Sequence, residues 1–217
     1  MSDPDPARPD PQSEPDFERI EARLREVLAA HVPGWARDLD EERARVHAGA
    51  GDLRPAAVAV LLERVPGYNL ILTKRTEDVE HHKGEISLAG GMADPGDPDA
   101  EATALREVQE ELGVDPQAVR VLGRLDRLVT VTGFQVTPVV AAIAAGHVFR
   151  PHPAEVERVL RVPLAALRDP ASWFEDVRTW EGRTYRLRSC RWGDDVIWGA
   201  TSRIVQNFLA VIPPEVL

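Results

Sequence analysis

The chain has 217 residues, of which 43% are hydrophobic, and a formal net charge of −10. This length suits one domain of ordinary size with an additional helix, and the apolar content suffices for a buried core. The acidic excess argues against a protein that coats nucleic acid, because the phosphate backbone is bound by lysine and arginine side chains. A small phosphorylated ligand is compatible with this charge, since it needs only a local cation or a metal.

The chain contains a single cysteine, Cys190, so no disulfide can form within it, and we expect this thiol to be inert. The first residues carry neither a basic cluster nor an apolar stretch, and no run of about 18 apolar residues occurs. We therefore expect a cytoplasmic protein with no membrane partner and no nucleic-acid partner. Four tryptophans are expected to pack in the core or at a subunit contact: Trp173, Trp180, Trp192 and Trp198.

The amino-terminal part is predicted to consist of a disordered tail and a helical extension. Residues 1–16 are rich in proline and aspartate and hold almost no large apolar side chains, so they cannot bury surface. Apolar side chains then recur at helical spacing, which predicts a helix over about residues 16–31, ended by Pro33-Gly34. Since residues 35–50 suit either a second short helix or a linker, 17–50 is assigned as the extension and 51–217 as the main domain.

The main domain is predicted to be an α/β structure in which a mixed β-sheet is sandwiched between helices. Its expected strands cover residues 56–64, 69–75, 119–128, 129–143, 146–151, 173–180 and 183–190. Its expected helices cover residues 99–113 and 200–212, with a further helical turn after Pro163. A long loop with short extended pieces is expected before the first of these helices, and Gly113 is expected to end that helix.

Three glutamates share one face of the predicted helix over 99–113. A helix turns by about 100° per residue, which places Glu110 and Glu111 within about 60° of Glu107. Carboxylates this close repel one another and raise each other's pKa, so exposure to water or a bound divalent cation must offset the cost. Such runs are often only a solvated helix face. Here, however, Gly90 and Gly91 precede the helix; glycines permit close backbone approach, and oxygen ligands beside them suit Mg²⁺.

The residues around this helix resemble the box of the Nudix hydrolases. The stretch R-E-V-Q-E-E-L-G-V, residues 106–114, matches the second half of the family pattern G-x5-E-x7-R-E-U-x-E-E-x-G-U, with U aliphatic, at every fixed position. The first half departs from the pattern, because fourteen residues rather than thirteen separate Gly91 from Arg106. The segment Asp97-Pro98-Asp99 occupies the region where the family has its first glutamate.

The preceding segment, L-T-K-R-T-E-D-V-E-H-H-K-G-E-I-S-L-A-G-G (residues 72–91), is similar to that of the coenzyme A pyrophosphatase branch of this family. The branch pattern is L-L-T-x-x-R-[SA]-x3-R-x3-G-x3-F-P-G-G. Here Arg75 comes one residue early, Glu80 stands in place of the second arginine, and Leu88-Ala89 replaces Phe-Pro. Later stretches are similar as well, so the resemblance covers about residues 53–212.

The resemblance implies a Mg²⁺- or Mn²⁺-dependent hydrolysis of a diphosphate linkage in a small nucleotide substrate. It implies these site residues: Glu107, Glu110 and Glu111 as catalytic groups and metal ligands, Gly91 as a carbonyl ligand, Arg106 as the orienting cation, and Arg75, Lys83, Gly90 and Gly91 at the substrate. Arg75 and Lys83 are the candidates for the 3′-phosphate of coenzyme A. The general base is open between the box and a later loop, for which Glu155 and Glu157 are candidates.

Three functions are compatible with these residues. The first is hydrolysis of coenzyme A or its derivatives to 3′,5′-ADP and 4′-phosphopantetheine. The second keeps the chemistry and changes the substrate to ADP-ribose, a dinucleotide or a nucleotide sugar. The third, a non-catalytic Nudix module that binds a nucleotide, is disfavoured by the intact glutamates. The first helix is expected either to cover a sheet edge or to pair with a second subunit in a homodimer.

Overall fold

The computed structural model describes residues 15–31, 53–77, 84–130, 132–180 and 183–217. Its centre is an eight-stranded mixed sheet with the main order β3-β2-β1-β7-β5, to which β4, β6 and β8 are added on β1, β7 and β2. These strands are β1 (Arg54–Arg64), β2 (Asn69–Arg75), β3 (Ile86–Ser87), β4 (Gly90–Met92), β5 (Arg120–Arg124), β6 (Leu128–Val129), β7 (Phe134–Ala144) and β8 (Val156–Pro163).

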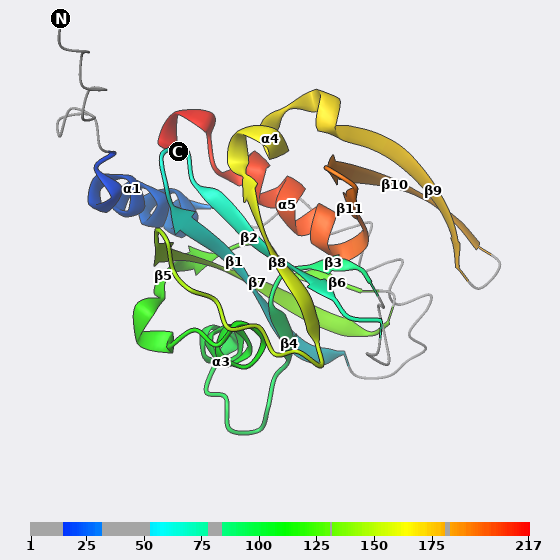
Figure 1. Cartoon of the computed structure of the whole chain (residues 1–217), viewed down its shortest axis with the longest axis horizontal. Helices are drawn as coiled ribbons and strands as arrows, with labels where there is room; N and C mark the ends of the chain where they lie inside the picture. Colours follow the sequence, from blue (N-terminus) through cyan, green and yellow to red (C-terminus); the bar gives the residue numbers. More distant parts are fainter. Residues whose placement is uncertain (1–14, 32–52, 78–83, 131, 181–182) are drawn as a thin grey trace, which may run out of the picture.

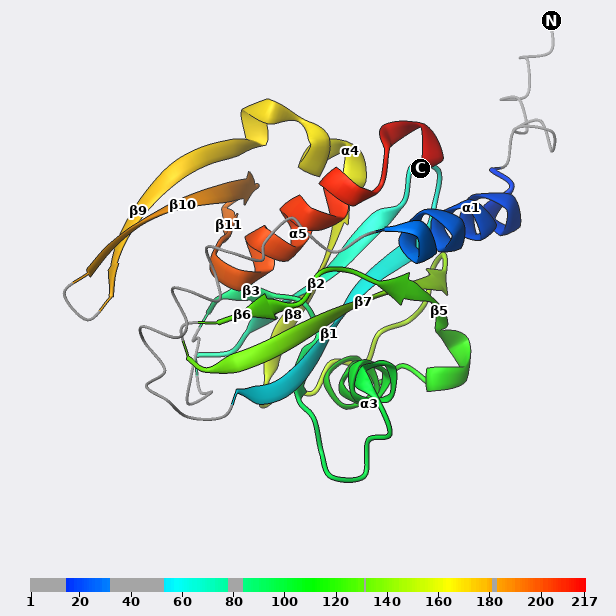
Figure 2. The same cartoon turned by 180° about the vertical axis from the view of Figure 1, so that it is seen from behind.

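Helices cover both faces of this sheet (Figures 1 and 2). They are α1 (Phe17–Ala30), α3 (Ala100–Leu112), α4 (Leu164–Arg168) and α5 (Gly199–Val211), with the 3₁₀ turns η1 (Pro116–Ala118), η2 (Pro170–Ser172) and η3 (Pro214–Val216). Helix α3 lies on one face, and α1 and α5 lie on the other. Because β1 is buried on both faces, its sequence is an almost unbroken apolar run rather than an alternation. The predicted fold class is confirmed.

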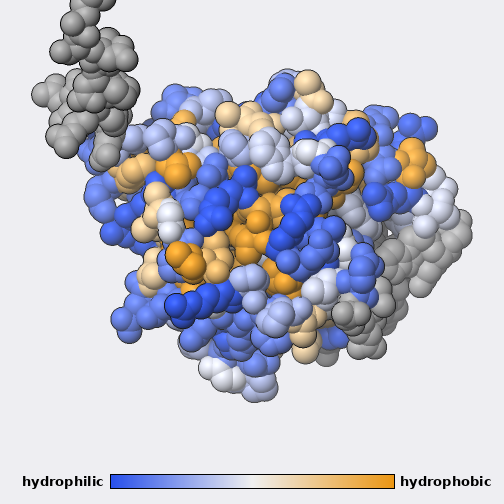
Figure 3. Space-filling model, viewed as in Figure 1, coloured by the Kyte–Doolittle hydropathy of each residue, from blue (hydrophilic) through white to orange (hydrophobic). Residues whose placement is uncertain are grey.

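A second, three-stranded antiparallel sheet follows the main one, with the order β11-β10-β9. It consists of β9 (Trp173–Trp180), β10 (Arg183–Trp192) and β11 (Asp195–Ile197). Strand β10 contacts α5, and the β9–β10 pair projects beyond that helix (Figure 2). Hydrophilic side chains cover most of the face seen in Figure 3. Among the helices of the described ranges, none has the length and apolar character needed to cross a membrane.

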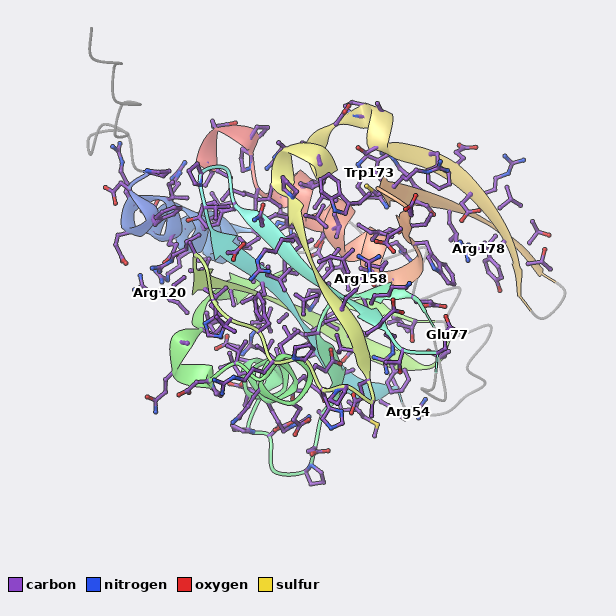
Figure 4. The ribbon with its side chains drawn as sticks, viewed as in Figure 1. Arg54, Glu77, Arg120, Arg158, Trp173 and Arg178 are labelled. Atoms are coloured by element: carbon purple, nitrogen blue, oxygen red, sulfur yellow. The ribbon has the colours of Figure 1, made fainter. Side chains whose placement is uncertain are left out.

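Helix α1 is held to the sheet by a buried ion pair rather than by apolar contacts alone. Glu21 is fully buried and accepts hydrogen bonds from Arg64 Nη2 at 2.7 Å and Arg120 Nη1 at 3.1 Å. Figure 4 labels Arg120 beside this helix. His31 Nε2 lies 3.0 Å from Asp126 Oδ1 at the other end of α1. The first helix is therefore confirmed as an element packed on the sheet, whereas its pairing with a second subunit stays a prediction.

Most predicted elements are present within a residue or two of their predicted bounds, but the strand predicted over 119–128 ends at Arg124 and the strand predicted over 129–143 begins only at Phe134. The predicted strand over 146–151 is wrong, because these residues form an irregular segment. Two backbone N–H groups at and just after the end of this segment donate hydrogen bonds to carbonyls at the end of α3. Arg150 N donates to Leu112 O at 2.8 Å, and His152 N donates to Glu111 O at 2.9 Å. Val148, which suggested a strand, is 75% exposed.

Several predictions concern residues outside the described ranges, namely the tail over 1–14, Pro33-Gly34, residues 35–50 and the turn at 181–182. The division into tail, extension and domain stays a prediction. Trp173 and Trp192 pack against the core as expected, whereas the side chain of Trp180 is not described. Cys190 is buried, and burial raises the pKa of its thiol to about 11, which agrees with the expected inertness.

Candidate active site

Helix α3 is fixed at both ends by residues that suit those positions. Asp99 caps the start of the helix, because its Oδ1 accepts hydrogen bonds from the backbone N–H groups of Glu101 and Ala102 at 2.9 Å. Gly113 ends it in the left-handed conformation with φ 65°. The apolar side of the helix, including Val108 and Leu112, is buried against the sheet. The glutamate side is thereby held towards β4, as the spacing predicts.

Arg106 connects the acidic groups of the site. Its Nη1 donates to Glu107 Oε1 at 2.9 Å and to Glu110 Oε2 at 2.8 Å, and its Nη2 donates to Met92 O at 2.9 Å. The same guanidinium donates to Asp97 Oδ2 at 3.1 Å, and these hydrogen bonds lower the pKa of Asp97. Arg106 is thus placed to orient glutamate side chains, and Asp97 holds it from the opposite side.

Glu107 lies directly against the glycine loop. Its side chain is 13% exposed, and its carboxylate occupies the space where a Cβ on Gly91 would lie. Burial raises the pKa of Glu107, while the neighbouring Arg106 acts in the opposite direction. Only glycine at position 91 allows the carboxylate and the loop backbone to approach this closely.

Glu111 is the most deeply buried of the three glutamates, at 2% exposure. Burial raises the pKa of its carboxyl to about 8, although Arg75 and a hydrogen bond from the Gly90 backbone oppose this shift. Arg75 Nη1 lies 3.8 Å from Glu111 Oε1, which is too far for a hydrogen bond. Two further buried atoms of this pair, Arg75 Nε and Glu111 Oε2, have no hydrogen-bond partner. Such orphaned groups are costly in a protein interior unless a bound species satisfies them.

The donor set fits a hard divalent cation in its chemistry. Glu107 and Glu111 supply buried carboxylate oxygens, and Gly91 adds a backbone carbonyl nearby, whereas Glu110 is 57% exposed and bound to Arg106. Among the described residues, no three acidic, histidine or cysteine side chains are already arranged around one point as a metal site.

The two candidate bases outside the box lie in different places. Glu157 belongs to β8 rather than to a loop, and its carboxylate accepts from Lys74 Nζ at 3.2 Å, so the predicted loop position is wrong for this residue. Glu155 immediately precedes β8, and its charge raises the pKa of both Glu107 and Glu111. Glu155 therefore lies close to the buried glutamates. Lys83 falls outside the described residues.

Sequence reasoning did not assign the role of Asp97. Its only signal was its position in the region where the box pattern has an acid. The structure shows that Asp97 Oδ2 accepts from Thr103 Oγ1 at 3.0 Å and from the backbone N–H of Asp94 at 3.0 Å, which fixes the loop at the start of α3.

Comparison with known proteins identifies the family of the chain. A family model described as NUDIX domain matches residues 52–181. The uncharacterized Nudix hydrolase NudL of Photorhabdus laumondii is 36% identical over 155 residues, which cover 71% of this chain and 82% of that protein. NudL of Pectobacterium atrosepticum is 38% identical over 155 residues, with 71% and 80% covered. The solved structure of DR0079 from Deinococcus radiodurans has a TM-score of 0.49 at 14% identity and covers 82% of this chain and 93% of that chain. The family match and the two relatives, together with the complete second half of the box, show that the chain belongs to the Nudix hydrolase family and is a pyrophosphatase.

Proposed function

We propose that this enzyme hydrolyses the diphosphate linkage of coenzyme A or its derivatives with Mg²⁺ or Mn²⁺, giving 3′,5′-ADP and 4′-phosphopantetheine. The observation that carries the chemistry is the buried pair of Glu111 and Arg75, each with one unpartnered polar atom. A cation at Glu111 Oε2 and a phosphate oxygen at Arg75 Nε would satisfy both atoms. The choice of coenzyme A is supported by the resemblance of residues 72–91 to the coenzyme A pyrophosphatase branch.

Glu107 and Glu111 are the proposed principal metal ligands, with the Gly91 carbonyl as a further ligand. A divalent cation held by these ligands would neutralise charge on the diphosphate and would make the attacking water more acidic. Glu110 is proposed as a third ligand or as a base that acts through water, consistent with its exposure. Arg106 orients Glu107 through its hydrogen bond.

Arg75 is proposed to bind the diphosphate rather than the 3′-phosphate. Its side chain is 24% exposed and lies beside Glu111, so its guanidinium belongs to the site of bond cleavage. The backbone of Gly90 and Gly91 would approach the same phosphates, since neither glycine carries a side chain that shields it. Lys83 and the general base stay predictions, with Glu155 as the candidate from outside the box.

The second candidate keeps the chemistry and changes the substrate to ADP-ribose, a dinucleotide or a nucleotide sugar. The departures from the branch pattern favour it, above all Leu88-Ala89 in place of Phe-Pro. Both residues are buried, at 4% and 3% exposure, so they pack in the core. Their effect on substrate choice would act through the path of the loop rather than through direct contact.

The test is cleavage of coenzyme A and of ADP-ribose with Mg²⁺ by the wild type and by Glu111→Gln, with products identified by mass. Glu101→Gln, on the first turn of α3, is the matched control and is expected to retain activity. Coenzyme A cleavage that collapses only in Glu111→Gln supports both substrate and site. Turnover of ADP-ribose alone would exclude coenzyme A as the substrate and would still support the glutamate site. Binding of a nucleotide without turnover of any diphosphate would point to the non-catalytic module.

A further inference from the structure

The β9–β10 pair continues beyond the three-stranded part of the second sheet as a two-stranded ribbon. Strand β11 pairs only with Cys190–Trp192 of β10, so residues 174–180 of β9 and 183–189 of β10 pair with each other. We call these two segments the ribbon. Two-stranded β-structures are marginally stable in water by themselves. An additional strand along the ribbon would therefore stabilise it.

One face of the ribbon lies towards the rest of the protein. The guanidinium carbon of Arg178 lies 3.8 Å from the centroid of the Trp198 ring, and both residues line a pocket of about 430 Å³ beside β2, which Lys74 also lines. Figure 4 labels Arg178 on this face. The opposite face carries Glu175 and Val177, and Val177 is 58% exposed although it is apolar.

The outer edge of β9 is open. Among the described strands, β9 pairs only with β10, and it lies on the side of the ribbon away from α5 (Figures 1 and 2). The strand has 8 residues, which is longer than an average strand. Proteins protect such edges with proline, with charged side chains, by covering them or by pairing them. Since β9 contains no proline, its charged residues decide whether the edge rejects or accepts a further strand.

The charges of β9 complement a second copy of the same strand. When two identical strands pair antiparallel around a two-fold axis, one residue lies opposite its own copy and its neighbours pair reciprocally. With Val177 on the axis, Asp176 lies opposite Arg178 of the partner subunit, and Glu175 lies opposite Thr179 of the partner subunit. Each of these pairs occurs twice, and opposite charges that face each other across two strands are stabilising.

The other registers are less favourable. An axis on Glu175, Asp176 or Arg178 would place that residue opposite its own copy, and like charges directly opposite each other are destabilising. A shift by a single position would turn opposing side chains to different faces of the sheet. The outer edge of β10 carries Arg186 and Arg188 on one face, which opposes pairing there. The charge pattern therefore selects both the edge and the register.

We propose that the ribbon forms a homodimer, in which β9 pairs antiparallel with β9 of a second copy and Val177 lies on the two-fold axis. The two ribbons then form one four-stranded sheet, and the open edge of β9 is covered. None of these residues belongs to the glutamate site, so the proposal does not depend on the proposed function. Because the contact is a single strand pair, we expect a weak dimer with a dissociation constant on the order of 10 μM.

The test is sedimentation of the full chain over a range of concentrations, with the wild type, Asp176→Arg and Arg178→Asp. The wild type should pass from monomer to dimer as the concentration rises. Each variant alone should dimerise at least about tenfold more weakly, because two attractive pairs become two repulsive pairs. An equimolar mixture of the two variants should dimerise again, since every arginine at these positions then faces an aspartate. A local folding defect in either variant would not be repaired by mixing.

Arg186→Asp is the matched control, because it changes the net charge as Arg178→Asp does, on an 80% exposed side chain outside the β9 edge. This variant should dimerise like the wild type. Hydrogen exchange adds a second readout. Backbone N–H groups of β9 should exchange more slowly as the concentration of the wild type rises, and should do so in the mixture but not in either variant alone.

Three results would overturn the proposal. A wild type that stays monomeric up to about 300 μM would show that the edge does not pair with its own copy. A dimer that persists unchanged in both variants would place the subunit contact elsewhere, as on α1. Failure of the mixed variants to dimerise would reject the register with Val177 on the axis.

Discussion

Replacing Glu111 by glutamine should change how the stability of the metal-free protein depends on pH. Burial raises the pKa of this carboxyl from 4.5 to about 8, so between these values the folded protein holds a proton that the unfolded chain releases. The free energy of unfolding therefore falls as the pH rises through this window, and the contribution is fully present below about pH 4.5. With about 1.4 kcal/mol per pKa unit, the group costs at most about 5 kcal/mol once it is ionised.

The assay is urea unfolding in EDTA between pH 5.5 and 8.5. The wild type should lose stability across this range, and Glu111→Gln should lose less, because its amide does not titrate. The carboxyl of Glu107 is present in both proteins, so the difference between the two curves reports Glu111. At pH 8, Mg²⁺ should restore stability to the wild type with release of a proton, and should have little effect on the variant.

Identical slopes of stability against pH in the two proteins would refute this reasoning. It would mean that Arg75, whose Nη1 lies 3.8 Å from Glu111 Oε1, already compensates the charge in full. A free energy of unfolding that rises with pH in the wild type would also refute it, because it would show that the Glu111 carboxyl ionises more easily in the folded protein than in the unfolded chain.

Two further predictions follow from contacts around the site and the first helix. Gly91→Ala places a methyl group where the Glu107 carboxylate lies, so calorimetric titration should show Mg²⁺ affinity reduced at least about tenfold, whereas Gly96→Ala, which has open space around it, should bind like the wild type. Equal affinities in both variants would contradict the proposed loop–carboxylate contact. Glu21→Gln breaks a buried ion pair and should cost about 3–5 kcal/mol in urea unfolding, whereas Glu26→Gln, which alters an exposed pair, should leave stability unchanged. A small effect at both positions would show that apolar contacts alone hold α1.

The elements of the fold that were predicted correctly are those whose signals are local. Helix α3 has a cap at Asp99, a left-handed Gly113 and an apolar stripe between them, so each part of its sequence favours the same structure. The wrong prediction over 146–151 has a tertiary cause. Its apolar residues look like a strand, but Arg150 donates its backbone N–H to the end of α3. Periodicity carries no information about such a partner.

The site was predictable to the extent that it lies within one helix and one loop. The box placed Glu107 and Glu111 together with Arg106, and the structure brings them to the glycine loop. The box pattern gave no reason to expect the hydrogen bond from Arg106 to Asp97, since that contact depends on the path of the loop. The pocket beside β2 could not be found in this way either, because its wall joins Lys74 with Arg178 and Trp198, which are far apart in the sequence.

The parallel pairing of β1 with β7 has a consequence for how the chain folds. Its partners are as distant in sequence as Arg54 and Phe134, so this ladder requires closure of a long loop before it contributes contacts. The pairings of β1 with β2 and β4, by contrast, lie within residues 56–92, and α3 follows directly. We expect the glycine loop and the glutamate helix to gain native contacts early in folding, and the sheet to close on β7 afterwards. The residues proposed for catalysis would then belong to the part of the chain that folds through short-range contacts.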